Sequence, residues 1–131
     1  MEAAERQARG LDLGRRLIHG IVAHDWVGIE ECFEPEARLR AVVPQENPFR
    51  DRLGAHDAAQ QLQRWFGDAD VTELVSSSVE PMGDRVRIAY RIHEHEPDGW
   101  YLVEQQAYLT PGERGIAFLN LVCSGFRPVP D

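Results

Sequence analysis

The segment from Val71 to Phe126 constrains the fold most, because its apolar and polar residues alternate in four stretches joined by short turns. The stretches are VTELVSSSVEP, RVRIAYRIHEHE, WYLVEQQAYL and IAFLNLVCSGF. Alternation with a period of two is the pattern of a strand that buries one face. Four such strands in succession predict an antiparallel meander, and its apolar face needs a second layer to cover it.

The first half of the chain supplies helices for that layer. A first helix is predicted from about Ala3 to Ala23, and its apolar residues recur at helical spacing: Leu11, Leu17, Ile18, Ile21 and Val22. Asp25 is a good N-cap for a short second helix, which Pro35 ends. The stretch HDAAQQLQRWF predicts a third helix, which Gly67 stops.

One further strand is predicted between the second and third helices. In ARLRAVV, four residues share an apolar face: Ala37, Leu39, Ala41 and Val43. About a dozen residues then form a loop that is long enough to be a lid or a pocket rim. The order α-α-β-α-β-β-β-β predicts a single α+β domain over residues 1–131, with the helices on one face of a curved, mostly antiparallel sheet.

The net charge of the chain makes some classes of binding partner unexpected. The formal net charge is -8, so neither nucleic acid nor an anionic membrane surface is an expected partner, because phosphate groups would repel the chain. All 14 basic residues are arginine, which excludes chemistry that needs a lysine amine. We see no signal peptide and no apolar stretch long enough for a membrane span. A cytoplasmic protein is expected, with Cys32 and Cys123 reduced.

The hairpin IHEHEPDGWY allows two registers, depending on which residues form its turn. A three-residue turn would pair Glu96 with Trp100, whereas a two-residue turn of Asp98 and Gly99 would pair Pro97 with Trp100. The two registers differ by one residue, which would turn every side chain of one strand to the other face of the sheet. We predict the two-residue turn, because it keeps the apolar faces of both strands together.

In that register His93 and His95 lie on the sheet face away from the helices, and His93 faces Glu104. Glu94 and Glu96 lie on the helix-facing side, near its end, where we expect them to meet solvent. Two histidines two residues apart on a strand can bind zinc, and Glu104 could supply a third ligand, so a metalloenzyme is one alternative. The other interpretation is a solvated or interfacial ladder without metal. We expect no metal and no cofactor.

The outer face of the sheet has the composition of an interface. It mixes aromatic and apolar side chains with charged ones: Trp100, Leu102, Tyr108, Ala89, Arg87, Arg91 and Glu104. Aromatic residues mixed with arginine are typical of interface cores. We therefore expect a homodimer through this face, and a His93–Glu104 pair there would make assembly sensitive to pH.

The helix-facing side carries polar residues among apolar ones. They are Glu73, Tyr90, Tyr101 and Gln105. Each must find a hydrogen-bond partner or a ligand, because a buried unsatisfied polar group costs about 1–3 kcal/mol. They could bond to one another or to trapped water, or they could line a mostly apolar pocket for a small molecule. Cys123 also faces inward, where a cysteine usually acts as a small apolar side chain.

Four stretches carry a resemblance to a known family: AHDWVGIEECFEPEARLRAVVP, WFGDADV, VEPMGDRVRIAYRI and VEQQAYLTPGERGIAFLNLVCSGF. The chain resembles the nuclear-transport-factor-2-like (NTF2-like) superfamily, and within it the SnoaL-like and ketosteroid-isomerase-like proteins, from about Leu11 to Pro128. The resemblance implies a cone-shaped fold that encloses an apolar pocket, and usually a dimer. Members of the family include polyketide cyclases, steroid isomerases, epoxide hydrolases, dehydratases and non-catalytic binders.

The resemblance does not extend to the catalytic residues of the ketosteroid isomerases. The positions of their tyrosine and two aspartates are Leu17, Ala41 and Gln105 here. Chemistry through that triad is therefore not expected. The arginine and paired aspartate of the epoxide hydrolases also find no inward positions in this chain.

Together these observations predict an enzyme that binds a small apolar molecule, resembling a polyketide, terpenoid or steroid, and carries out acid–base isomerisation, cyclisation or hydration. Glu73 is the predicted base, and Tyr90 and Gln105 would polarise a carbonyl group or orient the ligand. The predicted pocket residues are Trp65, Tyr101, Leu119, Cys123, His56 and Leu17, with His56 as an alternative base. The competing hypothesis is a non-catalytic ligand-binding or dimerisation module.

Overall fold

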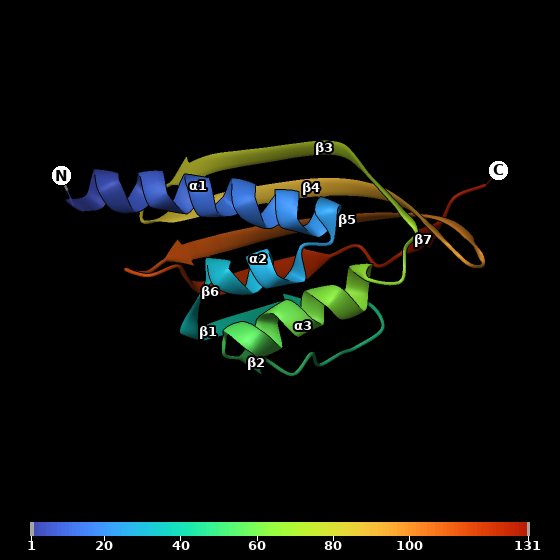
Figure 1. Ribbon diagram of the computed structural model, residues 1–131, viewed down its shortest axis with the longest axis horizontal. Coiled ribbons are helices and arrows are strands. Elements are labelled where there is room, and N and C mark those ends of the chain that lie inside the picture. The colour runs from blue at the N-terminus through green and yellow to red at the C-terminus, as the bar shows by residue number, and fades with distance from the viewer. Residues whose placement is uncertain (1, 131) are drawn as a thin grey trace.

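The computed structural model describes residues 2–130 and places three helices on one face of a curved sheet (Figure 1). The predicted α+β class is confirmed, and the predicted elements follow one another in the predicted order, with two additional strands of two residues each. The elements are α1 (Glu2–Ala23), α2 (Trp26–Cys32), β1 (Phe33–Val42), β2 (Arg52–Leu53), α3 (Ala55–Phe66), β3 (Val71–Met82), β4 (Arg85–Glu96), β5 (Gly99–Pro111), β6 (Ile116–Cys123) and β7 (Arg127–Pro128).

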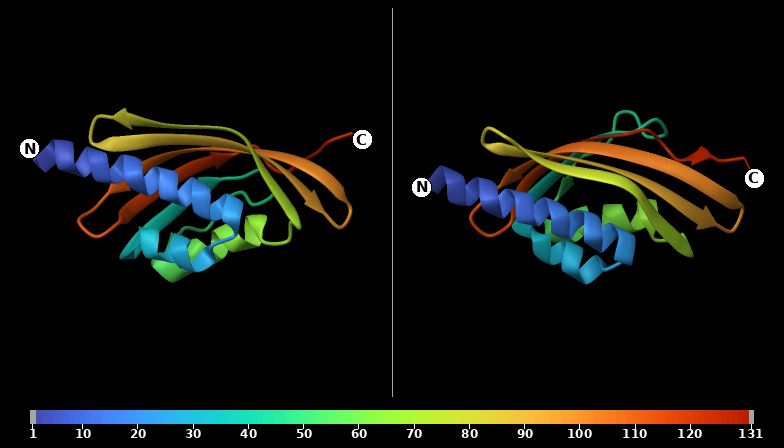
Figure 2. Two further views of the ribbon diagram at one scale, coloured as in Figure 1. Left: turned by 45° about the horizontal axis from the view of Figure 1, so that its top comes forward. Right: turned by 90° about the horizontal axis from the view of Figure 1, so that it is seen from above.

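The sheet has the strand order β2-β1-β6-β5-β4-β3, and the short strand β7 pairs with β5. The four long strands of the second half form the predicted antiparallel meander. β1 lies beside β6 and runs parallel to it. After β1 and β2 the chain crosses the sheet through α3 and enters the meander at its other edge, in β3. Figure 2 shows the sheet curving around the helices, and this concave side holds the core.

The core forms where the predicted apolar faces meet. Leu17 and Ile21 of α1 and Leu39 of β1 are completely buried, as their spacing predicts. Leu119 of β6 is completely buried as well, and Ile88 of β4 lies in the same cluster. Burying one such side chain contributes about 1.5–3 kcal/mol to folding. Leu17 and Leu119, which we predicted to line a pocket, therefore belong to the packed core.

β3 departs from simple alternation. Its register against β4 shifts between Leu74 and Ser76, so Val75 is an extra residue that forms a β-bulge. The bulge reverses which side chains face the helices: Thr72 and Leu74 face inward before it, and Ser77 faces inward after it. The prediction that Glu73 faces inward is wrong for this reason.

The hairpin between β4 and β5 turns through Pro97 and Asp98, so that Glu96 pairs with Gly99. Proline favours the second position of a type I turn and glycine the fourth, where Gly99 adopts φ +134°. The predicted register is wrong by two residues. A shift of two preserves the inward and outward faces but changes every partner, so His93 lies opposite Leu102 instead of Glu104.

Two boundaries also differ from the prediction. The second helix ends at Cys32, and Phe33 and Pro35 belong to β1. The last long strand ends at Cys123, because Gly125 adopts φ +82° and redirects the chain towards its pairing with β5. Between residues 2 and 130, no helix is long and apolar enough to span a membrane.

Candidate functional site

A row of three buried side chains crosses the sheet from β4 to β6. Tyr90 lies opposite Gln105, which lies opposite Cys123, and all three face the helices as predicted. The Tyr90 hydroxyl donates a hydrogen bond to Oε1 of Gln105. Burial, followed by the nearby Cys123 thiol, raises the pKa of Tyr90, so the phenol keeps its proton. The tyrosine therefore holds the amide group of Gln105 in a defined orientation.

The other end of that amide has no partner. Gln105 is 0% exposed, and its Nε2 finds no hydrogen-bond acceptor among residues 2–130. A buried donor without an acceptor costs about 1–3 kcal/mol, unless a ligand supplies the acceptor. The row from Tyr90 to Cys123 thus offers one fixed amide NH2 group, with its two N–H donors, to the interior.

Glu94 is the second unsatisfied group on the same face of the sheet. It is 0% exposed, and neither carboxyl oxygen accepts a hydrogen bond from an N–H or hydroxyl group in the described part of the chain. Burial, and then the neighbouring carboxyl group of Glu96, raises the pKa of Glu94 to about 9, with a smaller contribution from Asp68. At neutral pH the side chain is therefore an uncharged carboxylic acid.

Our expectation that Glu94 meets solvent is wrong, and the reason is how far the two neighbouring strands extend. β3 and β5 both remain paired with β4 beyond this position, up to His95 on one side and Glu96 on the other. Glu94 consequently lies between Thr72 on β3 and Tyr101 on β5, within the sheet and not at a frayed end. The alternating HEHE motif placed Glu94 on the correct face but gave no measure of its depth.

His24 approaches this end of the site from the corner between α1 and α2. Its backbone adopts φ +56°, a left-handed conformation that costs a non-glycine residue about 1–2 kcal/mol. Nε2 of His24 lies 2.9 Å from the Thr72 hydroxyl oxygen, and Thr72 is the β3 neighbour of Glu94. The imidazole ring also packs against Trp26, with 5.1 Å between ring centroids. Sequence reasoning missed His24, because its placement depends on this strained helix end.

Two of the predicted site residues lie away from the interior. Glu73 is 58% exposed on the outer face of the sheet, where Oε1 lies 3.2 Å from Nδ1 of His93. His56 is 67% exposed at the start of α3, and its Nδ1 lies 3.0 Å from Oε1 of Glu30. Neither residue reaches Tyr90 or Gln105, so the predicted base and the alternative base are both misplaced.

Two further predicted pocket residues lie at the border of the interior. Trp65 is half-buried on α3, and its ring centroid lies 5.8 Å from that of Phe49 in the loop after β1. The loop predicted to form a pocket rim therefore packs against α3. The Tyr101 hydroxyl donates to Asp98 at 2.6 Å near the hairpin tip, and this hydrogen bond raises the pKa of Tyr101.

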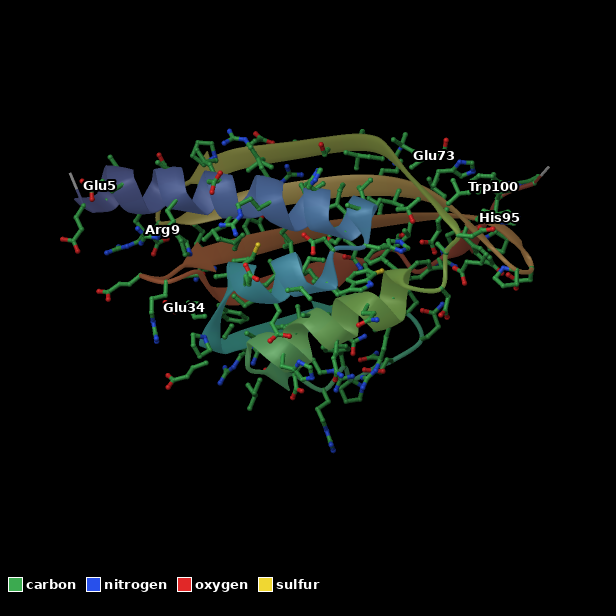
Figure 3. The ribbon with its side chains drawn as sticks, viewed as in Figure 1. Glu5, Arg9, Glu34, Glu73, His95 and Trp100 are labelled. Atoms are coloured by element: carbon green, nitrogen blue, oxygen red, sulfur yellow. The ribbon has the colours of Figure 1, made fainter. Side chains whose placement is uncertain are left out.

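The two histidines of the hairpin form a separate cluster outside the core. The His93 ring stacks on Trp100 at 4.3 Å, and His95 meets the edge of the same indole at 5.0 Å. Nδ1 of His95 lies 2.8 Å from Asp70, whose pKa is lowered by this hydrogen bond. Figure 3 shows Glu73, His95 and Trp100 together at this end of the sheet. In residues 2–130, no group of three or more His, Cys, Asp or Glu side chains is arranged to hold a metal ion.

Surface hollows are also present away from the interior. One of about 420 Å³ lies between α1 and α2 and is lined by Arg15, Arg16, His19, Gly20, Asp25, Gly28, Glu31 and Cys32. A second, of about 220 Å³, lies between α1 and β3. Gln105 and Glu94 are completely buried, and neither lines either of these two hollows.

No family model and no curated protein matches the sequence. Solved structures do match the fold. A protein described as an NTF2-like protein from Burkholderia xenovorans LB400 superposes with a TM-score of 0.69 and 8% identity, covering 90% of this chain and 91% of that one. This chain has an NTF2-like fold.

Other structures with the NTF2-like fold bear names of enzymes. One described as a SnoaL-like polyketide cyclase from Jannaschia sp. CCS1 has a TM-score of 0.73 and 14% identity, covering 91% of this chain and 88% of that one. An epoxide hydrolase of the LEH-like type from M. tuberculosis has a TM-score of 0.70 and 10% identity, covering 90% of this chain and 84% of that one. Identities this low establish the fold and leave the reaction to be argued from the site.

Proposed function

We propose that the chain is a small-molecule enzyme that carries out acid–base chemistry on a neutral, mostly apolar substrate between Glu94 and the Tyr90–Gln105 pair. One observation carries this proposal: both carboxyl oxygens of Glu94 and Nε2 of Gln105 are buried on one face of the sheet, and no N–H, hydroxyl or carbonyl group of residues 2–130 bonds to them. Native structures satisfy most buried polar groups, and exceptions concentrate where a ligand or a reaction uses them. A substrate with hydrogen-bonding oxygens would satisfy these atoms.

The two groups have complementary chemical roles. Glu94 carries a proton at neutral pH and can donate it to a substrate oxygen, after which the carboxylate can accept a proton from carbon or water. Nε2 of Gln105, oriented by Tyr90, can donate a hydrogen bond to a second oxygen and stabilise charge that develops there. This pairing supports isomerisation, cyclisation or hydration.

The surroundings of Glu94 favour an uncharged substrate. Glu96 and Asp68 are close enough to raise its pKa, and they would repel an anion. Ile92 and Val103, both buried, separate Glu94 from the Tyr90–Gln105 pair along the sheet. A polyketide, terpenoid or steroid-like molecule combines apolar area with spaced oxygens, and the polyketide cyclase and epoxide hydrolase names of the structural neighbours agree with such a class.

The test is turnover of hydrophobic ketones and epoxides by three proteins: the wild type, Glu94→Gln and Glu73→Gln. We expect Glu94→Gln to lose about 10²–10⁴-fold in rate, the usual contribution of a general acid or base. Glu73→Gln is the matched control, because it makes the same change on the exposed face of the neighbouring strand. Equal turnover by wild type and Glu94→Gln would remove Glu94 from the mechanism.

A non-catalytic binding module is the second candidate function. Leu17 and Ala41, at the positions that carry a tyrosine and an aspartate in the ketosteroid isomerases, are buried apolar residues here and supply no base. The binding module predicts that hydrophobic ketones raise the melting temperature of the wild type without forming product. Product formation that is lost in Glu94→Gln would support the enzyme and contradict the non-catalytic binding module.

We also propose that two copies pair through the outer face of the sheet. Tyr108 and Val122 are exposed apolar residues on the neighbouring strands β5 and β6. Arg91 pairs with Glu104 at 3.0 Å on the same face, so the predicted His93–Glu104 pair is wrong, and the pH-sensitive assembly that we predicted from it has no such pair to rest on. Sedimentation of the wild type and Val122→Asp tests the pairing, and a monomeric wild type would refute it.

Two cysteine thiols support a proposal about the cellular compartment of the protein. Cys32 and Cys123 are both free and buried. Reduced buried cysteines suit the cytoplasm, so we propose that the protein works there. Fractionation of the cells that make it, followed by detection with an antibody, tests this assignment.

A further inference from the structure

We propose that Glu96 is the solvent-side partner of Glu94, and that the two carboxyl groups share one proton and pass it between the buried site and water. This inference rests on the proposed function for its catalytic consequence, but the sharing itself can be tested without a substrate. Glu94 and Glu96 lie two residues apart on β4, so both face the helices. Glu94 is completely buried, whereas Glu96 is only half-buried beside the hairpin turn.

The charges around the pair favour a single shared proton. A third acid, Asp68, lies in the connection between α3 and β3, and its charge also raises the pKa of Glu94. The β3 and β5 neighbours of Glu94 are Thr72 and Tyr101, which carry no charge at neutral pH. Within residues 2–130, neither Glu94 nor Glu96 forms an ion pair with an arginine or a histidine. Two ionised carboxylates so close in a buried place would repel strongly, and one retained proton removes that repulsion.

The arrangement gives the buried acid a route to solvent. When Glu94 has donated the shared proton to the substrate, both carboxyl groups are ionised. Glu96 then takes a proton from hydronium at the hairpin end, which releases water, and passes it to Glu94: the O–H bond on Glu96 breaks and an O–H bond on Glu94 forms. The reverse sequence carries a proton from the site to solvent. Glu96 is therefore a positioning residue that acts through Glu94, and it does not touch the substrate.

The direct test is the titration of the glutamate side-chain carbons by ¹³C NMR, in the wild type, Glu96→Gln and Asp68→Asn. In the wild type we expect the titration curve of Glu94 to show two steps, as that of a site beside an interacting group does. In Glu96→Gln we expect the pKa of Glu94 to fall, because a like charge is gone. Asp68→Asn is the matched control and should lower it less, since Asp68 contributes less than Glu96.

The catalytic consequence has its own readout. The high-pH limb of the kcat/KM profile reports the acid form of Glu94, so it should move to lower pH in Glu96→Gln and return in Glu96→Asp. A merely structural role of Glu96 would lower the rate without moving the limb.

The two tests separate the two ideas. If the Glu94 resonance titrates identically in the wild type and Glu96→Gln, the shared proton is refuted. If the titration shifts as expected but the wild type turns over no ketone or epoxide, the pair stands and the proposed enzyme function fails.

Discussion

The buried carboxyl group of Glu94 should make the folded state lose stability as pH rises. Its pKa is about 9 in the folded protein, against an ordinary value of 4.5. The folded state therefore holds a proton that the unfolded state has released at pH values between these two. Stability falls with rising pH wherever the unfolded chain binds fewer protons. The loss of folding stability caused by ionising Glu94 is absent below about pH 4.5 and is complete above about pH 9.

The size of the effect follows from the same interval. Each unit between the two pKa values is worth about 1.36 kcal/mol, so the full interval corresponds to roughly 6 kcal/mol as an upper limit. Structural relaxation and water penetration reduce such penalties in real proteins. We therefore expect the wild type to lose about 2–4 kcal/mol between pH 5 and 9 relative to a variant that cannot ionise at this position.

Glu94→Gln is that variant, because its neutral amide resembles the protonated carboxyl group in shape. The free energy of unfolding is measured by urea denaturation of both proteins at several pH values from 5 to 9. Their difference cancels the contributions of all other titrating groups. The difference should grow in favour of Glu94→Gln as the pH rises. A difference that stays constant over this range would show that Glu94 titrates normally, and the argument from its burial would fall.

Three other changes test the packing. Tyr90→Phe should cost about 1–3 kcal/mol, because it leaves Oε1 of Gln105 buried without a donor, and adding Gln105→Leu should recover much of that loss in urea denaturation. Gly99→Ala should destabilise the hairpin by about 1 kcal/mol or more, because alanine is strained at φ +134°, and the melting temperature will report it. Gly20→Ala should cost about 1–3 kcal/mol, because its Cβ would lie 2.6 Å from Cγ1 of Ile29, and an unchanged melting temperature would contradict this close packing.

Local patterns determine which face of the sheet a side chain occupies. The alternation in RVRIAYRI places Tyr90 inward, and the following strand places Gln105 inward, since side chains on a strand alternate with a period of two. This result survived the wrong hairpin register, because a slip of two residues leaves both faces unchanged. The fold class could be predicted for the same reason: helical and strand periodicities are properties of short segments.

Three features of the candidate site depend on contacts between distant segments. The bulge at Val75 reverses the faces of β3 and exposes Glu73, and no residue type in VTELVSSSVEP marks it. His24 reaches Thr72 only through the strained corner between α1 and α2. Glu94 is buried because β3 and β5 both extend beside it, so its depth is set by the lengths of its neighbours in the sheet. The sequence by itself determined the directions in which side chains point, whereas the tertiary structure decided which of them lose water, because burial depends on how many other segments cover a position.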